Sequence, residues 1–491
     1  MLKIITTIGA IQALAILVTL IRSKVAAMLL GPEGVGIISL VDQVVQFAAH
    51  LSALSIPFAA VKFLSRAHSE GFQTFRRSYV SFLNALLLQA LAGMGATLGL
   101  VVFRAEPLLG AEIVKYRSFL LIALCGIPAM ILGGFFSNVL AAAQRFKAAA
   151  TMAFVTAAAS TLSTCIGVSI GGIIGLYWCN VLAGALVTIG TLIYLRQTLN
   201  LPLYDKTVKV FDELKRSPDI ILFSLFLYLG ASTYSLSLLV ARYAVFKNFG
   251  EMEAGLLQAA MALAISIGLV LNPANGLFLT PIMNRNIGKE EKLRTATEFK
   301  KTLIIVLSVV AMPIVLFSQW LLTLLFSQRF TDAGQYVFLF VFSQCVLQLA
   351  GVYQALIIGL DDLKTYAAIT CMGHLALALF SWLLAPLYGI FGVGISFAIA
   401  SAAIFLMTLA RLRLTHGFSF PGKLGLLMGY SLSALLLVGI IFSKPGDHNI
   451  IVALFKVGIY FLFIGSLAFF LSREERSLLY SFWGKLRLRT L

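Results

Sequence analysis

Charged residues are scarce in this chain, and their scarcity is the first guide to its class. Aspartate, glutamate, lysine and arginine make up 12% of the 491 residues, whereas hydrophobic residues make up 60%. A soluble protein of this length could not hide so much apolar surface, so the composition predicts an integral membrane protein. Acidic residues are the scarcer charge, with 20 against 37 basic residues and a net charge of +17.

The basic excess does not indicate nucleic acid binding. The lysines and arginines are concentrated in short loops between apolar runs, where positive charge sets the orientation of membrane helices. We therefore expect membrane lipid as a partner and no nucleic acid.

Catalytic and cofactor motifs are also missing. The chain has no HExxH, no phosphate-binding GxxxxGK[ST] and no GxSxG, so it is not expected to be an enzyme or to carry a cofactor or metal. Its five cysteines lie in apolar segments without a CxxC pair, which is typical of packing residues. Without a phosphate-binding loop, any transport must draw on an ion gradient, the membrane potential or downhill substrate flow.

Long apolar runs predict an all-α integral membrane fold with about fourteen transmembrane helices, because a bilayer-crossing helix needs about 20 mostly apolar residues. The first run is read as an uncleaved span and not as a signal peptide. The predicted spans are 3–30, 36–64, 78–103, 117–142, 148–170, 173–195, 219–247, 254–283, 301–326, 335–359, 365–386, 390–411, 424–443 and 450–471.

Alternate loops are rich in lysine and arginine, which predicts the orientation. One set contains Arg76 and Arg77, a cluster from Arg285 to Lys301 that includes Lys300, and the basic tail after Arg473. The opposite loops are short and poor in basic residues. Since basic loops stay in the cytoplasm, we expect a multi-pass membrane protein with both termini cytoplasmic.

An internal repeat divides the chain into two halves. Gly31 and Gly36 recur about 219 positions later as Gly250 and Gly255, and a second match about 217 positions apart pairs Gly172 with Gly389. This distance spans an even number of helices, so the halves share one orientation. We expect an N-lobe at 1–200, a basic cytoplasmic linker at 201–218, a C-lobe at 219–415, and two extra helices with a basic tail at 416–491.

Three cations lie inside apolar spans at matching places in the two halves. They are Arg22 and Lys24 in the first span and Arg242 in the seventh. A cation within the bilayer is costly unless it faces water, an anion or a partner, which favours a polar cavity for an anionic substrate. The alternative is snorkelling toward the membrane surface, which is the preferred interpretation for Lys247 near the end of its helix.

Asp42 is the acid well inside an early span. It is either a counter-charge for Arg22 or Lys24 or the carrier of a coupling proton or sodium ion. Polar amides at helical spacing suggest a groove for sugar hydroxyls, although each alone more often makes interhelical hydrogen bonds. The candidate sugar contacts are Gln43, Gln46, Gln258, Gln344 and Gln348.

Segments 22–36 (RSKVAAMLLGPEGVG), 325–331 (LFSQRFT) and 386–394 (PLYGIFGVG) resemble the Wzx-type lipid-linked oligosaccharide flippases. These belong to the multidrug/oligosaccharidyl-lipid/polysaccharide exporter superfamily. The resemblance covers most of 1–415. It implies two six-helix lobes in a V around a central cavity, with two added helices.

The same resemblance implies that the chain flips an undecaprenyl-diphosphate-linked oligosaccharide, such as an O-antigen or other surface polysaccharide unit, to the periplasmic leaflet. Arg22, Lys24 and Arg242 are the expected diphosphate ligands, and a polysaccharide polymerase and chain-length proteins are the expected protein partners. An ion-coupled multidrug antiporter and a peptidoglycan-precursor flippase of the same superfamily are the alternatives. A membrane polymerase or ligase is less compatible with the short extracytoplasmic loops.

Overall fold

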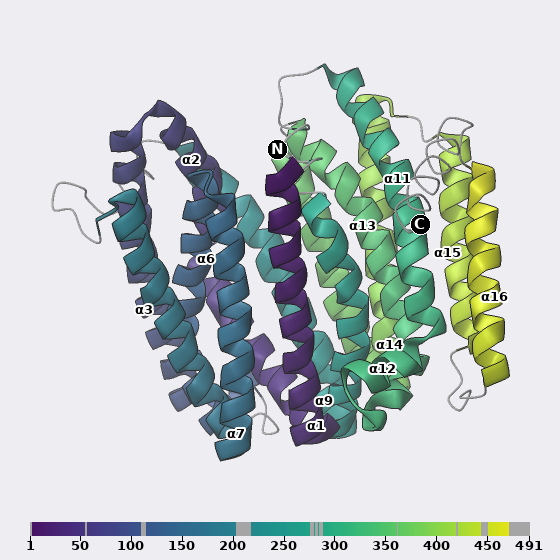
Figure 1. The fold of residues 1–491 in the computed structure, drawn as a ribbon, viewed down its shortest axis with the longest axis horizontal. Helices are drawn as coiled ribbons and strands as arrows, with labels where there is room; N and C mark the ends of the chain where they lie inside the picture. Colours follow the sequence, from purple (N-terminus) through teal and green to yellow (C-terminus); the bar gives the residue numbers. More distant parts are fainter. Residues whose placement is uncertain are drawn as a thin grey trace, which may run out of the picture. The chain divides into compact units, whose positions relative to one another are not determined.

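The fold is helical throughout the part of the chain that the structure describes (Figure 1). The structure is a computed structural model that describes residues 2–54, 56–109, 114–202, 218–274, 279, 283, 288–360, 362–418, 421–442 and 450–470. Over these residues it contains no strand, which confirms the all-α membrane fold. Most of the predicted linker and the tail after residue 470 lie outside the described residues.

The helices alternate with short connections along the whole described chain. Their bounds are α1 Leu2–Ala53, α2 Ile56–Glu70, α3 Phe72–Leu109, α5 Arg117–Leu124, α6 Ile127–Ala142, α7 Phe146–Leu199, α9 Pro218–Ala274, α11 Lys289–Leu316, α12 Ser318–Leu325, α13 Val337–Gly359, α14 Leu363–His416, α15 Gly422–Phe442 and α16 Ile450–Leu467, with short 3₁₀ helices at Gln328–Gln335 and Ala468–Phe470.

Nine apolar segments within the described ranges are long enough to cross a bilayer by length and composition. Four of them, in α1, α7, α9 and α14, are divided in two by a glycine with non-helical dihedral angles. Dividing these four and adding the shorter apolar helix α16 gives fourteen segments, the number expected from the sequence.

The dividing glycines have the same backbone geometry in both copies of the repeat. Gly31 has φ 68° and ψ −175°, and its counterpart Gly250 has φ 86° and ψ −172°. Gly172 has φ 56° and ψ −138°, and its counterpart Gly389 has φ 56° and ψ −135°. Residues with a side chain rarely adopt these angles, so glycine permits a sharp reversal of the chain. At these two places the backbone carries the repeat predicted from the sequence.

Several predicted spans differ from the helices observed. Residues 36–64 do not form one helix, because the left-handed Leu54 (φ 45°) ends α1 and α2 begins at Ile56, with Pro57 in its first turn. Span 301–326 is interrupted at Phe317, and the helix before it begins earlier, at Lys289. Span 117–142 is interrupted at Cys125 and Gly126, ahead of a proline in the first turn of α6.

The chain forms two compact units, each with its own packing. Unit 1 contains Met1–Ala259, Leu322–Phe330 and Leu363–Ala400. Within it, helices α1 to α7 bury an apolar core whose members include Leu40 and Phe135. Leucine side chains on its outer surface are exposed, Leu186 by 71%, as expected where the surrounding solvent is lipid.

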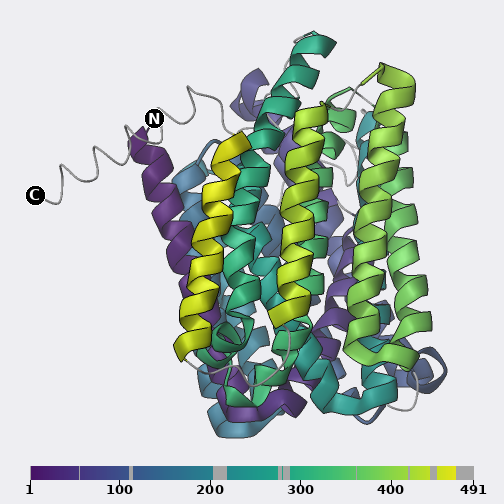
Figure 2. The same ribbon diagram turned by 90° about the vertical axis from the view of Figure 1, so that its right-hand side faces the viewer.

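Unit 2 contains Ala260–Leu321, Thr331–Asp362 and Ser401–Leu491. Here α11 packs against α13, α15 and α16 (Figure 2). The hydroxyl of Tyr460 on α16 donates a hydrogen bond of 3.2 Å to the carbonyl oxygen of Val309 on α11. The last two helices are therefore integral to the packing of this unit.

Lys300 is not in a loop, in contrast to the sequence-based assignment. Because α11 begins at Lys289, Lys300 lies within the helix and its side chain is fully buried. Its ammonium group lies 3.9 Å from the ring centre of Tyr353 and 4.2 Å from that of Phe405. Aromatic faces attract a desolvated cation, which explains how unit 2 accommodates this charge.

Candidate substrate site

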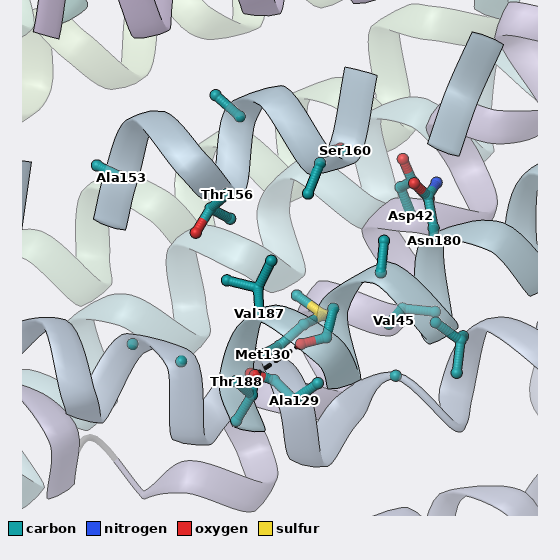
Figure 3. A pocket seen from close by; sticks show the side chains of 18 of the residues that line it. Asp42, Val45, Ala129, Met130, Ala153, Thr156, Ser160, Asn180, Val187 and Thr188 are labelled. Atoms are coloured by element: carbon teal, nitrogen blue, oxygen red, sulfur yellow. Dashed lines mark hydrogen bonds between the residues drawn. The ribbon is translucent and has the colours of Figure 1, made fainter. Parts of the chain in front are cut away.

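A cavity of about 650 Å³ lies within unit 1, among α1, α5, α6 and α7. The sequence makes room for it, because the facing parts of α6 and α7 are rich in glycine, alanine, serine and threonine. Figure 3 shows Asp42 and Asn180 at one end of the lining and Ala153 at the other. Arg22, Gln46 and Tyr177 also line the cavity.

Arg22 contributes the cavity's cationic group. The side chain is half-buried, and its Nε donates a hydrogen bond of 3.1 Å to Oγ1 of Thr164 on α7. The two terminal nitrogens of Arg22 make no hydrogen bond to the described residues, so they are available to a ligand. A guanidinium group fixed through Nε still presents the paired donors that suit a phosphate.

Asp42 lies between two arginines. Its carboxylate accepts a hydrogen bond of 3.1 Å from the hydroxyl of Tyr177, and it is within electrostatic reach of both Arg22 and Arg242. The structure thus brings together two of the three predicted diphosphate ligands and the predicted acid. The acid offsets part of the positive charge in a region that the bilayer surrounds.

Arg242 is more deeply placed than Arg22 and does not line the cavity. Its side chain is 7% exposed, and Nη1 donates a hydrogen bond of 2.8 Å to the carbonyl oxygen of Ser39 on α1. Its Nε is buried without a hydrogen-bond partner among the described residues. Arg242 therefore connects the first half of α9 to the second half of α1 and retains an unused donor.

Lys24 points away from Arg22. Residues two positions apart on a helix point in directions about 200° apart around its axis, so Arg22 and Lys24 cannot share a face. The Nζ atom of Lys24 donates a hydrogen bond of 2.9 Å to the carbonyl oxygen of Thr323 on α12. The structure does not bring Lys24 to the cavity that Arg22 lines.

The five glutamines predicted as sugar contacts are in different surroundings. Gln43 is 1% exposed and donates to both the carbonyl and the hydroxyl oxygen of Ser235, at 3.1 and 3.2 Å. Gln46 is exposed and lines the cavity, whereas Gln258 on α9 has a buried Oε1 without a partner in the described residues. Gln344 and Gln348 belong to α13 in unit 2. In this structure, only Gln46 of the five lines the cavity.

Polar residues of α7 supply contacts that the sequence did not single out. Thr164 orients Arg22, Tyr177 binds Asp42, and the hydroxyl of Ser163 donates to Oδ1 of Asn180. Serine and threonine are common in membrane helices, and nothing in their spacing distinguishes these from their neighbours. Only the fold shows that Tyr177 and Asn180 line the cavity, and that Thr164 and Ser163 bind other residues of its lining.

Acidic and basic groups meet again next to Gly250. Lys115 makes an ion pair of 3.0 Å with Glu251, and the hydroxyl of Tyr116 donates a hydrogen bond to the same carboxylate. The carboxylate raises the pKa of Lys115, and burial together with this hydrogen bond raises the pKa of Tyr116. These contacts attach the chain before α5 to the bend in α9.

Comparison with known proteins gives a family match. Residues 2–287 match the model of a family described as "Polysaccharide biosynthesis protein", which is more than half of the chain. No match is found among the curated proteins.

Solved structures of transporters share the fold. One is an inward-facing multidrug resistance MATE family transporter of the MOP superfamily, 15% identical over 83% of this chain and 96% of that one, with a TM-score of 0.67. Another is the lipid II flippase MurJ in an inward closed conformation, 14% identical over 96% and 99%, with a TM-score of 0.64. An outward-facing MATE family transporter is 16% identical over 84% and 95%, with a TM-score of 0.61. At these identities the likeness shows the fold alone.

Proposed function

We propose that this chain, which belongs to the polysaccharide biosynthesis protein family, is a flippase for an undecaprenyl-diphosphate-linked oligosaccharide. It moves an O-antigen or another surface polysaccharide unit from the cytoplasmic to the periplasmic leaflet of the bacterial inner membrane by alternating access. Both termini are in the cytoplasm, and a polysaccharide polymerase and chain-length proteins receive the cargo.

The observation that carries this proposal is Arg22, a cation within a membrane helix that lines an open cavity. Its Nε is fixed by Thr164 and its terminal nitrogens are not used by the described residues. A diphosphate is a compact anion that can replace the lost hydration of such a group, and charge-assisted hydrogen bonds are strong in a low-dielectric cavity. The polyprenyl tail can stay in lipid while the polar part crosses.

Arg242 and Lys24 act with Arg22 in the transport cycle. Arg242 holds the carbonyl of Ser39 and keeps a free Nε, and Lys24 holds the carbonyl of Thr323. A backbone carbonyl is a weaker partner for a cation than a phosphate, so the substrate can compete for both side chains. Asp42 is either the counter-charge that keeps the empty site stable or the group that couples transport to a proton or sodium ion.

Two rival functions share the fold. A multidrug antiporter would bind cations. The charged groups of this cavity are Arg22 and Asp42, and Asp42 also interacts with Arg242, so the arrangement suits an anion better. A peptidoglycan-precursor flippase would carry a related lipid diphosphate, so the two flippases differ in the sugar and not in the anion. The proposal favours the surface polysaccharide because of the family match.

Export of surface polysaccharide in cells tests the proposal. In a strain that lacks its own exporter and expresses this chain with the matching glycosyltransferases, we expect Arg22→Ala and Arg242→Ala to abolish export while folded protein remains in the membrane. Lys247→Ala is the matched control, because Lys247 is exposed and lies over the ring of Trp382. Normal export by both arginine variants would contradict the assigned roles, and drug extrusion without export would favour the antiporter.

A further inference from the structure

We infer that the cavity in unit 1 is the binding site for the sugars next to the diphosphate. The inference rests on the proposed function, because Arg22 would hold the diphosphate at the same cavity. Its volume of about 650 Å³ is within the range of about 300–1,000 Å³ typical of ligand pockets. A lipid diphosphate held by Arg22 places its first sugars against the walls formed by α6 and α7.

Two threonine hydroxyls in the wall are arranged as acceptors. Thr156 donates its proton to the carbonyl oxygen of Met152 at 2.8 Å, and Thr188 donates to that of Gly184 at 2.8 Å and that of Ala129 at 3.3 Å. Since these protons are used within the protein, the oxygens offer lone pairs to the cavity. Sugar hydroxyls are donors as well as acceptors and can bind to them.

Asn180 supplies the complementary donor. Its Oδ1 accepts a hydrogen bond from Ser163, which fixes the amide and leaves Nδ2 without a partner among the described residues. The amide lines the same end of the cavity as Asp42 (Figure 3). An amide donor beside a carboxylate acceptor suits neighbouring sugar hydroxyls, one accepting and one donating.

Much of the rest of the wall consists of small residues, which leaves room for a sugar beside the polar groups. Gly133, Gly134 and Ala129 of α6 and Ala157 and Gly184 of α7 belong to the lining. Tyr177 is the aromatic residue of the lining among the described residues, and its hydroxyl is bound to Asp42. A polyprenyl chain would not use the hydroxyl and amide groups, and burying them against it would leave them unsatisfied.

Filling the cavity tests the inference. A β-carbon at Gly134 would meet no atom within 4 Å, and Gly134 lines the cavity, so Gly134→Leu adds volume at the cavity wall. Gly190→Leu is the matched control, because Gly190 also has no atom within 4 Å and does not line the cavity. The purified variants in lipid nanodiscs are titrated with undecaprenyl diphosphate and with undecaprenyl-diphosphate-linked N-acetylglucosamine, and thermal unfolding verifies that each is folded.

The unaltered protein should bind the sugar-bearing lipid about tenfold more tightly than the bare diphosphate lipid, as two additional hydrogen bonds would give. Gly134→Leu should abolish this preference and leave the affinity for undecaprenyl diphosphate unchanged, whereas Gly190→Leu should keep both. If Gly134→Leu does not fold, Thr156→Val combined with Thr188→Val, which removes two acceptors at nearly constant volume, should reduce the preference instead. A preference that survives in the folded variants, or that the unaltered protein lacks, overturns the inference. Failure of the unaltered protein to bind either lipid overturns the proposed function itself.

Discussion

Gly36 on α1 packs directly on the carbonyl oxygen of Glu251 on α9, leaving no space for a β-carbon. The contact has a reciprocal partner, because Gly255 packs in the same way on the carbonyl oxygen of Pro32. Pro32 and Glu251 are themselves equivalent in the repeat, 219 positions apart. Within unit 1, the two copies of the glycine turn therefore meet symmetrically, backbone against backbone.

This contact predicts that alanine is not tolerated at either glycine. Gly36→Ala or Gly255→Ala would force the helices apart, and overpacking of this kind typically costs about 1–3 kcal/mol. Each variant should have a clearly lower unfolding temperature in detergent. Gly99→Ala is the control, since no atom lies within 4 Å of its β-carbon position and alanine favours a helix. Unfolding temperatures equal to that of the control would show that the contact is not tight.

The proposed contact of the two terminal nitrogens of Arg22 with a phosphate predicts graded effects in a series of substitutions. Arg22→Ala should weaken binding of undecaprenyl diphosphate by about tenfold or more, the value of a charge-assisted hydrogen-bond pair. Arg22→Lys should keep part of the affinity, because it retains the charge and loses the fork. Thr164→Val should have a smaller effect, since it removes only the partner of Nε. If all three variants bind undecaprenyl diphosphate as tightly as the unaltered protein, Arg22 does not contact the phosphate.

Gln43 is predicted to be structural and not part of the site. Gln43→Leu would remove two hydrogen bonds to Ser235 from a buried position, at a cost of about 1–3 kcal/mol. The variant should unfold at a lower temperature and keep the preference for the sugar-bearing lipid. Gln46→Leu, which alters an exposed residue lining the cavity, should keep the unfolding temperature and reduce the preference for the sugar-bearing lipid. Loss of sugar preference in a fully stable Gln43→Leu would reverse this assignment.

The ion pair between Lys115 and Glu251 predicts a dependence on pH and salt. The pKa of Lys115 is raised by Glu251, so the stability from this pair is present below the ordinary lysine value of 10.5 and is lost as the pH rises through the raised value. The side chain of Lys115 is 70% exposed, so added salt should screen the pair. The difference in unfolding temperature between the unaltered protein and Lys115→Met should therefore shrink at high pH and at high salt. A constant difference would indicate a packing effect.

The sequence predicted the architecture best where glycine and charge are constrained by the membrane. The glycine turns at Gly31 and Gly250 were identifiable because a repeat preserved them, and the resemblance to exporters of this superfamily is confirmed by the family match and the shared fold. Pro57 is a local signal for a kink in the predicted span 36–64, but the left-handed Leu54 that ends α1 has none. Lys300 was misplaced because its burial depends on Tyr353 and Phe405, which are distant in sequence.

The candidate site was predicted in part for the same reason. The charges of Arg22, Asp42 and Arg242 stand out against an apolar background, and the structure brings them together in unit 1. The glutamines do not stand out in this way, because helical spacing gives a face and not the neighbour that the face meets. Gln43 and Gln46 are one turn apart, yet one is buried against Ser235 and the other lines the cavity.

The central claim is that Arg22 binds the diphosphate of a lipid-linked sugar during its passage across the membrane. The most direct measurement is the rate at which undecaprenyl-diphosphate-linked N-acetylglucosamine, placed in the inner leaflet of proteoliposomes, becomes accessible to an impermeant glycosyltransferase outside. The account predicts rapid exposure with the unaltered protein, a rate reduced by about tenfold or more with Arg22→Ala, and an unchanged rate with Lys247→Ala. Equal rates for the unaltered protein and Arg22→Ala, at equal amounts of folded protein, would contradict it.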